Sequence, residues 1–156
     1  MAELPQVEPQ VEPQVFVWTG QRVRFHEVDH AGIVFFAKFY EYCHIAYEEF
    51  IEQVGGYGPN RFFRENDFGA PLVATRSSHH HPLFHGDRLT IRCWVAQLGR
   101  SSMTMRYEIR NEADKLCATV YTRHAFISRA SFRAIEIPDD IRAALAPYLQ
   151  AEDLTW

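Results

Sequence analysis

The strongest helical pattern in the chain lies between residues 36 and 54. Apolar side chains recur there at the i, i+3, i+4 and i+7 spacing of one helix face, at Phe36, Phe39, Tyr40, Cys43, Tyr47, Phe50, Ile51 and Val54. Ala37, Ile45 and Ala46 widen this face until much of the helix surface is apolar. A helix of this kind is normally enclosed by other elements. The pattern therefore predicts one long apolar helix that ends at Gly55-Gly56.

Most of the remaining chain alternates apolar and polar residues with the period of a β-strand. The alternation predicts strands over residues 15–25, 72–84, 88–98, 101–110 and 115–128. Turn residues separate the last four of these strands, at Gly86-Asp87, Gly99-Arg100 and Asn111 to Asp114. Short loops between successive strands indicate an antiparallel meander.

These elements predict an α+β fold in which a curved antiparallel sheet of about five strands wraps one helix. A second helix is expected over residues 138–149, and residues 61–65 are a candidate short helix. Residues 1–14 contain a tandem VEPQ repeat with a proline at every fourth position, which predicts a disordered, proline-rich tail. One domain is therefore expected over residues 15–150. Its uncovered sheet edges favour oligomers.

Composition narrows the class of protein. The 156 residues are 47% apolar, which is enough for a packed core, and the net charge of −4 lacks the basic excess of a nucleic-acid-binding protein. No apolar run approaches the about 20 residues that span a bilayer, and the amino terminus lacks the features of a secretory signal. The three cysteines, Cys43, Cys93 and Cys117, form no CxxC pair. We therefore expect a reduced, cytoplasmic protein with no membrane or nucleic-acid partner.

Asp29 is the main candidate for chemistry, because it lies in a glycine-containing turn just before the apolar helix. A carboxylate at this place can activate a water or attack an acyl carbon, while backbone N–H groups at the helix start, such as that of Phe36, can stabilise an oxyanion. The same residue can instead simply cap the turn. The spacing alone leaves both interpretations open.

The segment from Phe25 to Phe36, FHEVDHAGIVFF, followed by Phe39-Tyr40, resembles the motif of the 4-hydroxybenzoyl-CoA thioesterase family in the hotdog superfamily. The resemblance implies a hotdog fold, a homodimer or homotetramer, and hydrolysis of acyl-CoA thioesters without a metal or other cofactor. It assigns Asp29 as the catalytic carboxylate and the Phe36 backbone N–H as the group that polarises the thioester carbonyl. Some relatives have a histidine where this chain has Phe36, so that variant of the site is not expected here.

The resemblance also implies substrate-binding residues. His44 takes the helix position at which the hydroxybenzoyl enzyme has a carboxylate near the substrate phenol, and the segment from Cys43 to Glu48 is more similar to the 1,4-dihydroxy-2-naphthoyl-CoA thioesterases. An aromatic acyl group is therefore favoured. Arg100, Ser101 and Ser102 start a strand where relatives often have a basic segment near CoA, whose phosphates need cations. His44 can equally face water or a second subunit.

Three further interpretations remain. His79 and His81 would share a strand face and could hold a metal, but partly exposed histidines, one of them lining the substrate cleft, fit the sequence better, and no metal site is predicted. A hotdog hydratase or dehydratase would use His30 with Asp29. A non-catalytic module that binds acyl-CoA or acyl-carrier protein would bind thioesters without turnover. The identity of the acyl group is not fixed by the sequence.

Overall fold

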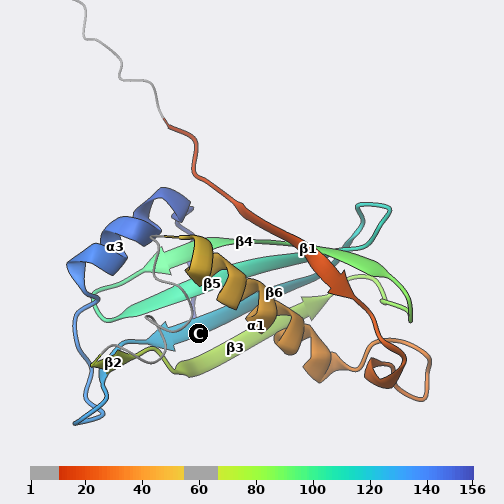
Figure 1. Cartoon of the computed structure of the whole chain (residues 1–156), viewed down its shortest axis with the longest axis horizontal. Coiled ribbons are helices and arrows are strands. Elements are labelled where there is room, and N and C mark those ends of the chain that lie inside the picture. Colours follow the sequence, from red (N-terminus) through yellow and green to blue (C-terminus); the bar gives the residue numbers. More distant parts are fainter. Residues whose placement is uncertain (1–10, 55–66) are drawn as a thin grey trace, which may run out of the picture.

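A five-stranded antiparallel sheet with one helix across its face forms the body of the molecule (Figure 1). The computed structural model describes residues 11–54 and 67–156. The sheet has the order β1-β4-β5-β6-β3, with strands β1 (Phe16–Arg22), β3 (Leu72–His79), β4 (Arg88–Leu98), β5 (Ser102–Arg110) and β6 (Leu116–Ala125). Helix α1 spans Phe36–Gln53. The smaller elements are η1 (Phe25–Glu27), β2 (Phe68–Gly69), β7 (Ile127–Ser128), α3 (Asp139–Leu145) and η2 (Ala146–Tyr148).

The meander prediction is confirmed for β4, β5 and β6, which pair in sequence order, but it is wrong for β3. That strand pairs with β6 at the far edge of the sheet, so residues 80–87 cross from one edge toward the other. This connection is held against the segment before α1, because the Val34 N–H donates to the Leu83 carbonyl at 2.9 Å. Strand β3 ends at His79 rather than at residue 84, and the next two N–H groups, of His80 and His81, both donate to the Cys117 carbonyl.

The prediction of one long apolar helix also needs correction. Helix α1 has 18 residues and is apolar on one face only. Its buried side chains are Phe39, Tyr42, Cys43, Ala46, Tyr47, Phe50 and Ile51. Phe36 and Ile45, which widened the apolar pattern, are 61% and 38% exposed, and Glu41 and Glu48 also face outward. The sheet therefore covers one face of the helix, and its other face stays open within a single chain.

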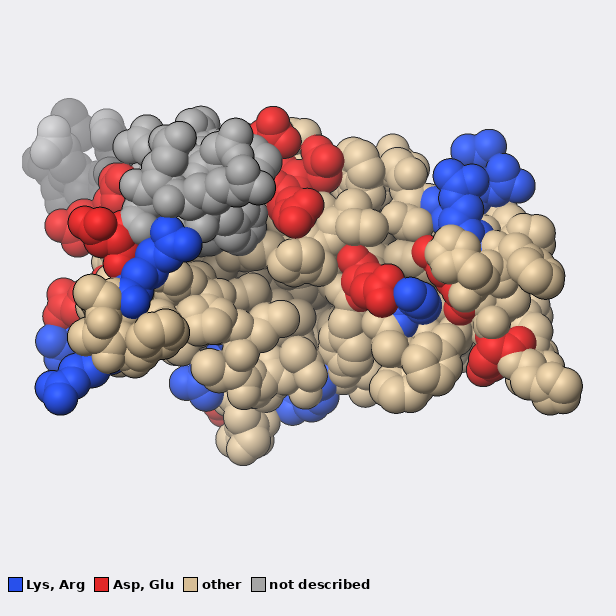
Figure 2. Space-filling view, turned by 60° about the horizontal axis from the view of Figure 1, so that its bottom comes forward, with Lys and Arg blue, Asp and Glu red and all other residues tan. Residues whose placement is uncertain are grey.

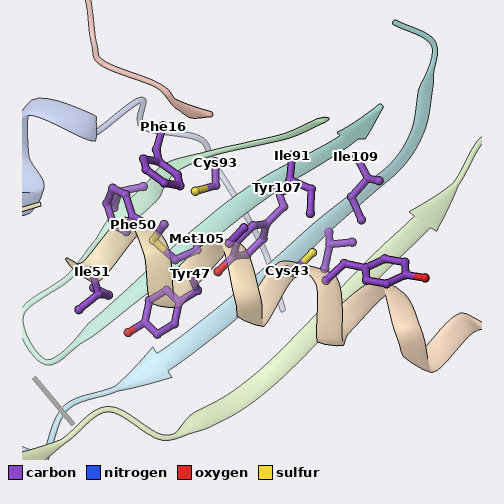
Figure 3. Packing of buried hydrophobic residues seen from close by; sticks show 14 of the residues in the cluster. Phe16, Cys43, Tyr47, Phe50, Ile51, Ile91, Cys93, Met105, Tyr107 and Ile109 are labelled. Atoms are coloured by element: carbon purple, nitrogen blue, oxygen red, sulfur yellow. The ribbon is translucent and has the colours of Figure 1, made fainter. Parts of the chain in front are cut away.

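The core lies between this helix face and the alternate strand residues that point at it (Figure 3). Phe50 of α1 meets the ring of Phe16 edge-on, with centroids 5.7 Å apart. The predicted alternation is confirmed in β4 and β5, where Ile91, Cys93, Met105, Tyr107 and Ile109 are all buried. Each buried side chain of this size contributes about 1.5–3 kcal/mol to folding.

The chain ends differ from the expected elements in detail. The helix predicted over 138–149 is α3 followed by the short η2, because Pro147 cannot continue a regular helix. Residues 11–14 are extended and exposed, and Gln14 N–H donates to the Pro147 carbonyl at 2.9 Å. The rest of the predicted tail and the candidate helix over 61–65 lie outside the described residues. In the described part of the chain, no helix is long and apolar enough to cross a membrane.

His124 of β6 is a buried histidine within this core. Its Nδ1 lies 3.0 Å from the Ala70 carbonyl, which can only accept, so Nδ1 carries the hydrogen. Its Nε2 then accepts from the Thr122 hydroxyl at 3.1 Å, and its ring stacks on Tyr47 with centroids 4.8 Å apart. Burial lowers the pKa of His124 to about 4, so the folded protein holds this ring neutral.

This pKa predicts that stability falls as the pH drops from about 6.5 to about 4, because the unfolded chain takes up a proton that the folded chain refuses. Over this range His124 should contribute a loss of roughly 3 kcal/mol, from 1.36 kcal/mol per pKa unit. Urea unfolding at several pH values measures the effect. The His124→Gln variant should have a flatter profile than its parent, and the exposed His85→Gln should not. An unchanged profile in His124→Gln would contradict a neutral buried His124.

Candidate active site

Asp29 sits at the start of a tight turn that reverses the chain just before α1. The Gly32 N–H donates to the Asp29 carbonyl at 3.0 Å, and Gly32 has φ +79°, a left-handed conformation that favours glycine. The Asp29 carboxylate oxygen Oδ1 accepts from the Ala31 N–H at 2.8 Å and from the Ile33 N–H at 3.4 Å. The carboxylate therefore does cap the turn, through N–H groups of the turn itself rather than those of the helix.

Glu27 connects this turn to the helix through hydrogen bonds. Its carboxylate is buried and accepts at 2.7 Å from both the Arg24 N–H and the Tyr42 hydroxyl of α1. Burial and the adjacent carboxylate raise the pKa of Tyr42 far above its usual value, so this hydroxyl stays protonated and donates. The Glu27 carbonyl also accepts from the Phe35 N–H at 2.9 Å, directly at the start of α1. Both ends of the Asp29 turn are thus tied to one residue.

A cleft of about 520 Å³ opens beside the turn. Asp29 lines it together with Ile33, Val34, Phe35, Phe36, Phe39, Leu83 and the strand-end residues His79, His80, His81 and Pro82. This volume lies within the range of about 300–1,000 Å³ that is usual for small-molecule sites. The walls are mainly aromatic and aliphatic, and the carboxylate stands at the margin of an apolar surface.

The start of α1 reaches the same cleft. Phe35 is the N-cap residue and makes no side-chain capping hydrogen bond. The Lys38 N–H donates to the Phe35 carbonyl at 2.9 Å, whereas the Phe36 N–H, as the first of the helix, has no partner inside the helix. Such groups carry the positive end of the helix dipole and favour a negative charge. The structure therefore brings two of the predicted site residues, Asp29 and Phe36, to the same cleft.

His44 does not line this cleft. It is half exposed on α1, with Nε2 3.5 Å from a Glu48 carboxylate oxygen. It borders a separate cavity of about 40 Å³ beside His124, which is too small for an aromatic ring.

Arg100, Ser101 and Ser102 form the β4–β5 turn beside α3, at the end of the sheet opposite the start of α1 (Figure 1). Arg100 pairs with Glu136 at 2.6 Å, and its side chain is 80% exposed. These three residues border two surface hollows that exclude Asp29. Within one chain they are therefore apart from the acid.

The sequence assigns no role to Glu27 or Tyr42. Among the three histidines His79, His80 and His81 it suggests a metal pair of His79 and His81, which it does not favour, and a place in the cleft for one histidine that it does not specify. All three histidines line the cleft. The spacing of Glu27 two residues before Asp29 held no signal for its burial, since that depends on Tyr42 from the helix. In the described segments, no group of three or more His, Cys, Asp or Glu residues is placed to hold a metal ion.

Comparisons with known proteins agree with this architecture. A family model described as the thioesterase-like superfamily matches residues 23–145. A 1,4-dihydroxy-2-naphthoyl-CoA hydrolase from Crocosphaera subtropica is 37% identical over 111 residues, which cover 70% of this chain and 80% of the relative. A second such hydrolase, from Nostoc punctiforme, is 34% identical over 78% of this chain and 81% of its own length.

A crystal structure of a 1,4-dihydroxy-2-naphthoyl-CoA thioesterase from Synechocystis is similar in fold, with a TM-score of 0.77 and 26% identity over 85% of this chain and 96% of that one. A helix laid on a five-stranded antiparallel sheet is the fold of the hotdog thioesterases. This chain belongs to the thioesterase-like superfamily.

The Glu27–Tyr42 hydrogen bond yields a stability prediction. Tyr42→Phe removes the hydroxyl and leaves a buried carboxylate with one donor fewer, so the free energy of unfolding should fall by about 1–3 kcal/mol. Urea unfolding measures this loss. Tyr148→Phe is the control, because that ring packs edge-on to Phe50 and its change removes only a hydroxyl elsewhere in the core. Equal stability of Tyr42→Phe and the wild type would contradict the anchoring role of Glu27.

Proposed function

We propose that this protein hydrolyses aromatic acyl-CoA thioesters to the free acid and CoA. The observation that carries the proposal is the meeting of Asp29 and the uncapped start of α1 at one apolar cleft. Hydrolysis of a thioester needs an activated oxygen nucleophile and a donor for the oxyanion that forms on the carbonyl. These two parts are present within the same chain. The superfamily supports the general activity, thioester hydrolysis.

In the proposed reaction the thioester carbonyl oxygen accepts from the Phe36 N–H. The Asp29 carboxylate takes a proton from a water, whose oxygen bonds to the carbonyl carbon. The negative charge then formed on the carbonyl oxygen is stabilised by the helix start. Collapse of this tetrahedral intermediate breaks the C–S bond and releases the CoA thiolate, which takes up a proton. The alternative is that Asp29 itself attacks the carbonyl carbon and forms an acyl anhydride, which water then hydrolyses. Asp29 is the catalytic carboxylate in both cases.

The aromatic preference rests on the cleft wall and on the relatives. Phe35 and Phe36 lie with ring centroids 4.7 Å apart beside Phe39, so the wall offers several aromatic surfaces to a flat acyl group. The similar proteins are named for hydrolysis of 1,4-dihydroxy-2-naphthoyl-CoA. A dihydroxynaphthoyl or hydroxybenzoyl unit is the substrate class that we assign, and membership of the 4-hydroxybenzoyl-CoA thioesterase family is part of this proposal.

We further propose that the site is completed by a second copy of the chain. Strand β3 is an edge strand of eight residues, and its outer side chains include Val73, which is 58% exposed. Figure 2 turns this edge forward and shows a surface on which uncharged side chains predominate. Pairing of two β3 edges would make a homodimer, or a homotetramer of two such dimers. Arg100, Ser101, Ser102 and His44 would then act on CoA or the acyl group from the other copy.

The same proposal includes hydrolysis without a metal or other cofactor, and action in the cytoplasm. The support for the compartment is that Cys43, Cys93 and Cys117 are all buried free thiols. Burial raises the pKa of each of these thiols, which keeps them unreactive. None of them takes part in the proposed reaction.

The central test replaces Asp29 by Asn and measures release of CoA from 4-hydroxybenzoyl-CoA and 1,4-dihydroxy-2-naphthoyl-CoA. Asn keeps an oxygen that can cap the turn but cannot accept the proton, so turnover should fall about 100- to 10,000-fold with the fold intact. Asp87→Asn is a matched control, because the Asp87 carboxylate also caps a turn, through the Phe84 N–H at 2.9 Å, but does not line the cleft.

Full turnover by Asp29→Asn would remove Asp29 from the reaction. Tight binding of the esters without any turnover by the wild type would instead favour a binding module. Hydration of an enoyl-CoA would favour the hydratase class.

The assembly proposal is tested with Val73→Lys, which places a charge on the exposed β3 edge. Analytical ultracentrifugation should find the wild type as a dimer or tetramer and the variant shifted toward the monomer, with a parallel loss of turnover. Lys115→Glu, a charge change in the β5–β6 turn, is the control. A fully active monomer would contradict a site shared between copies.

A further inference from the structure

His79 lies in the same cleft as Asp29, but the proposed hydrolysis does not use it. It is the last residue of β3 and shares a strand face with Ser77, two residues earlier. The ring of Phe39 from α1 meets the imidazole edge-on, with centroids 4.6 Å apart. This packing holds the ring against the helix at a place where His79 also lines the cleft.

A chain of side-chain hydrogen bonds sets the orientation of this imidazole. The Tyr40 hydroxyl of α1 donates to the Ser77 hydroxyl oxygen at 3.0 Å, and that oxygen lies 3.2 Å from His79 Nε2. Because the Ser77 oxygen receives the Tyr40 hydrogen, its own hydrogen can point to Nε2. A neutral imidazole that accepts at Nε2 carries its hydrogen on Nδ1. In this tautomer His79 offers an N–H donor from Nδ1.

The neighbouring histidines are directed elsewhere. His80 Nε2 lies 3.1 Å from the Thr119 hydroxyl on β6, and His81 Nδ1 lies 2.8 Å from the Pro82 carbonyl. His44, the residue expected from the resemblance to touch the acyl ring, borders the small separate cavity instead. Of the three histidines that line the cleft, His79 is the one whose ring packs on Phe39 of the aromatic wall, which places it beside a flat acyl group in the cleft.

An aromatic acyl group that carries a ring hydroxyl needs such a donor or acceptor, because an unpaired hydroxyl in an apolar cleft is costly. We propose that His79, oriented by Ser77 and Tyr40, binds the ring hydroxyl oxygen of the aromatic acyl group and so selects hydroxylated over unsubstituted aryl thioesters. This inference rests on the proposed hydrolysis and assigns the specificity of that same site. His79 is a specificity-determining residue, and Ser77 and Tyr40 are positioning residues.

The test compares kcat/KM for two matched pairs of substrates, 4-hydroxybenzoyl-CoA against benzoyl-CoA and 1,4-dihydroxy-2-naphthoyl-CoA against 2-naphthoyl-CoA. The wild type should prefer the hydroxylated member of each pair. His79→Ala should lower kcat/KM about 10-fold or more for the hydroxylated members, as expected for one lost hydrogen bond, and change the other members less than about 3-fold.

Three further variants make the test specific. Tyr40→Phe and Ser77→Ala should weaken the preference in the same direction by a smaller factor, and His79→Gln, which keeps an N–H donor, should restore part of it. His85→Ala is the control, because His85 packs edge-on against Phe25 and does not line the cleft. Thermal unfolding should confirm that every variant is folded.

The outcomes separate the two proposals. A wild type that hydrolyses none of the four esters would overturn the proposed function together with this inference. A wild type that hydrolyses them, combined with a His79→Ala variant that keeps the preference or loses both members of a pair equally, would overturn the inference alone. Loss of the preference in His44→Ala but not in His79→Ala would also overturn it, in favour of His44 as the residue that binds the ring hydroxyl.

Discussion

The buried carboxylate of Glu27 is the contact on which the proposed site depends. It accepts from the backbone before the Asp29 turn and from Tyr42 on the helix, and the backbone carbonyl of Glu27 accepts from the N–H of Phe35, the N-cap residue of α1. A buried carboxylate without donors would be strongly unfavourable, so the burial of Glu27 requires the Arg24 N–H and the Tyr42 hydroxyl as partners. The relative position of the acid and the helix start follows from this constraint.

The position of the helix is in turn set by the sheet. One face of α1 packs on the alternate residues of β4, β5 and β6, and the register of these strands fixes where its first turn emerges. The crossing segment 80–87 then closes the cleft through the Val34–Leu83 hydrogen bond. Neither the acid nor the helix start is part of the core, yet both are placed by it.

Local patterns were sufficient for much of this architecture. The period of two located β4 and β5 almost to the residue, and the helical spacing located α1. Both succeed because burial of one face produces a regular spacing of apolar residues along the sequence. The Asp29 motif pointed to the turn that borders the cleft.

Sequence patterns did not predict features that depend on a tertiary contact. The place of β3 beside β6, the burial of Glu27 by Tyr42, and the approach of His79 to Phe39 each depend on residues distant in sequence. The sequence pattern overestimates how much of the α1 surface is enclosed, because Phe36 and Ile45 fit the helical spacing but face outward.

The most direct test of the proposed site is a crystal structure of the Asp29→Asn variant with 4-hydroxybenzoyl-CoA bound. We expect the thioester carbonyl oxygen within hydrogen-bonding distance of the Phe36 N–H, the carbonyl carbon next to the substituted side chain at position 29, and the ring on the Phe35, Phe36 and Phe39 wall. A thioester seated elsewhere, with its carbonyl away from the start of α1, would contradict the proposed site.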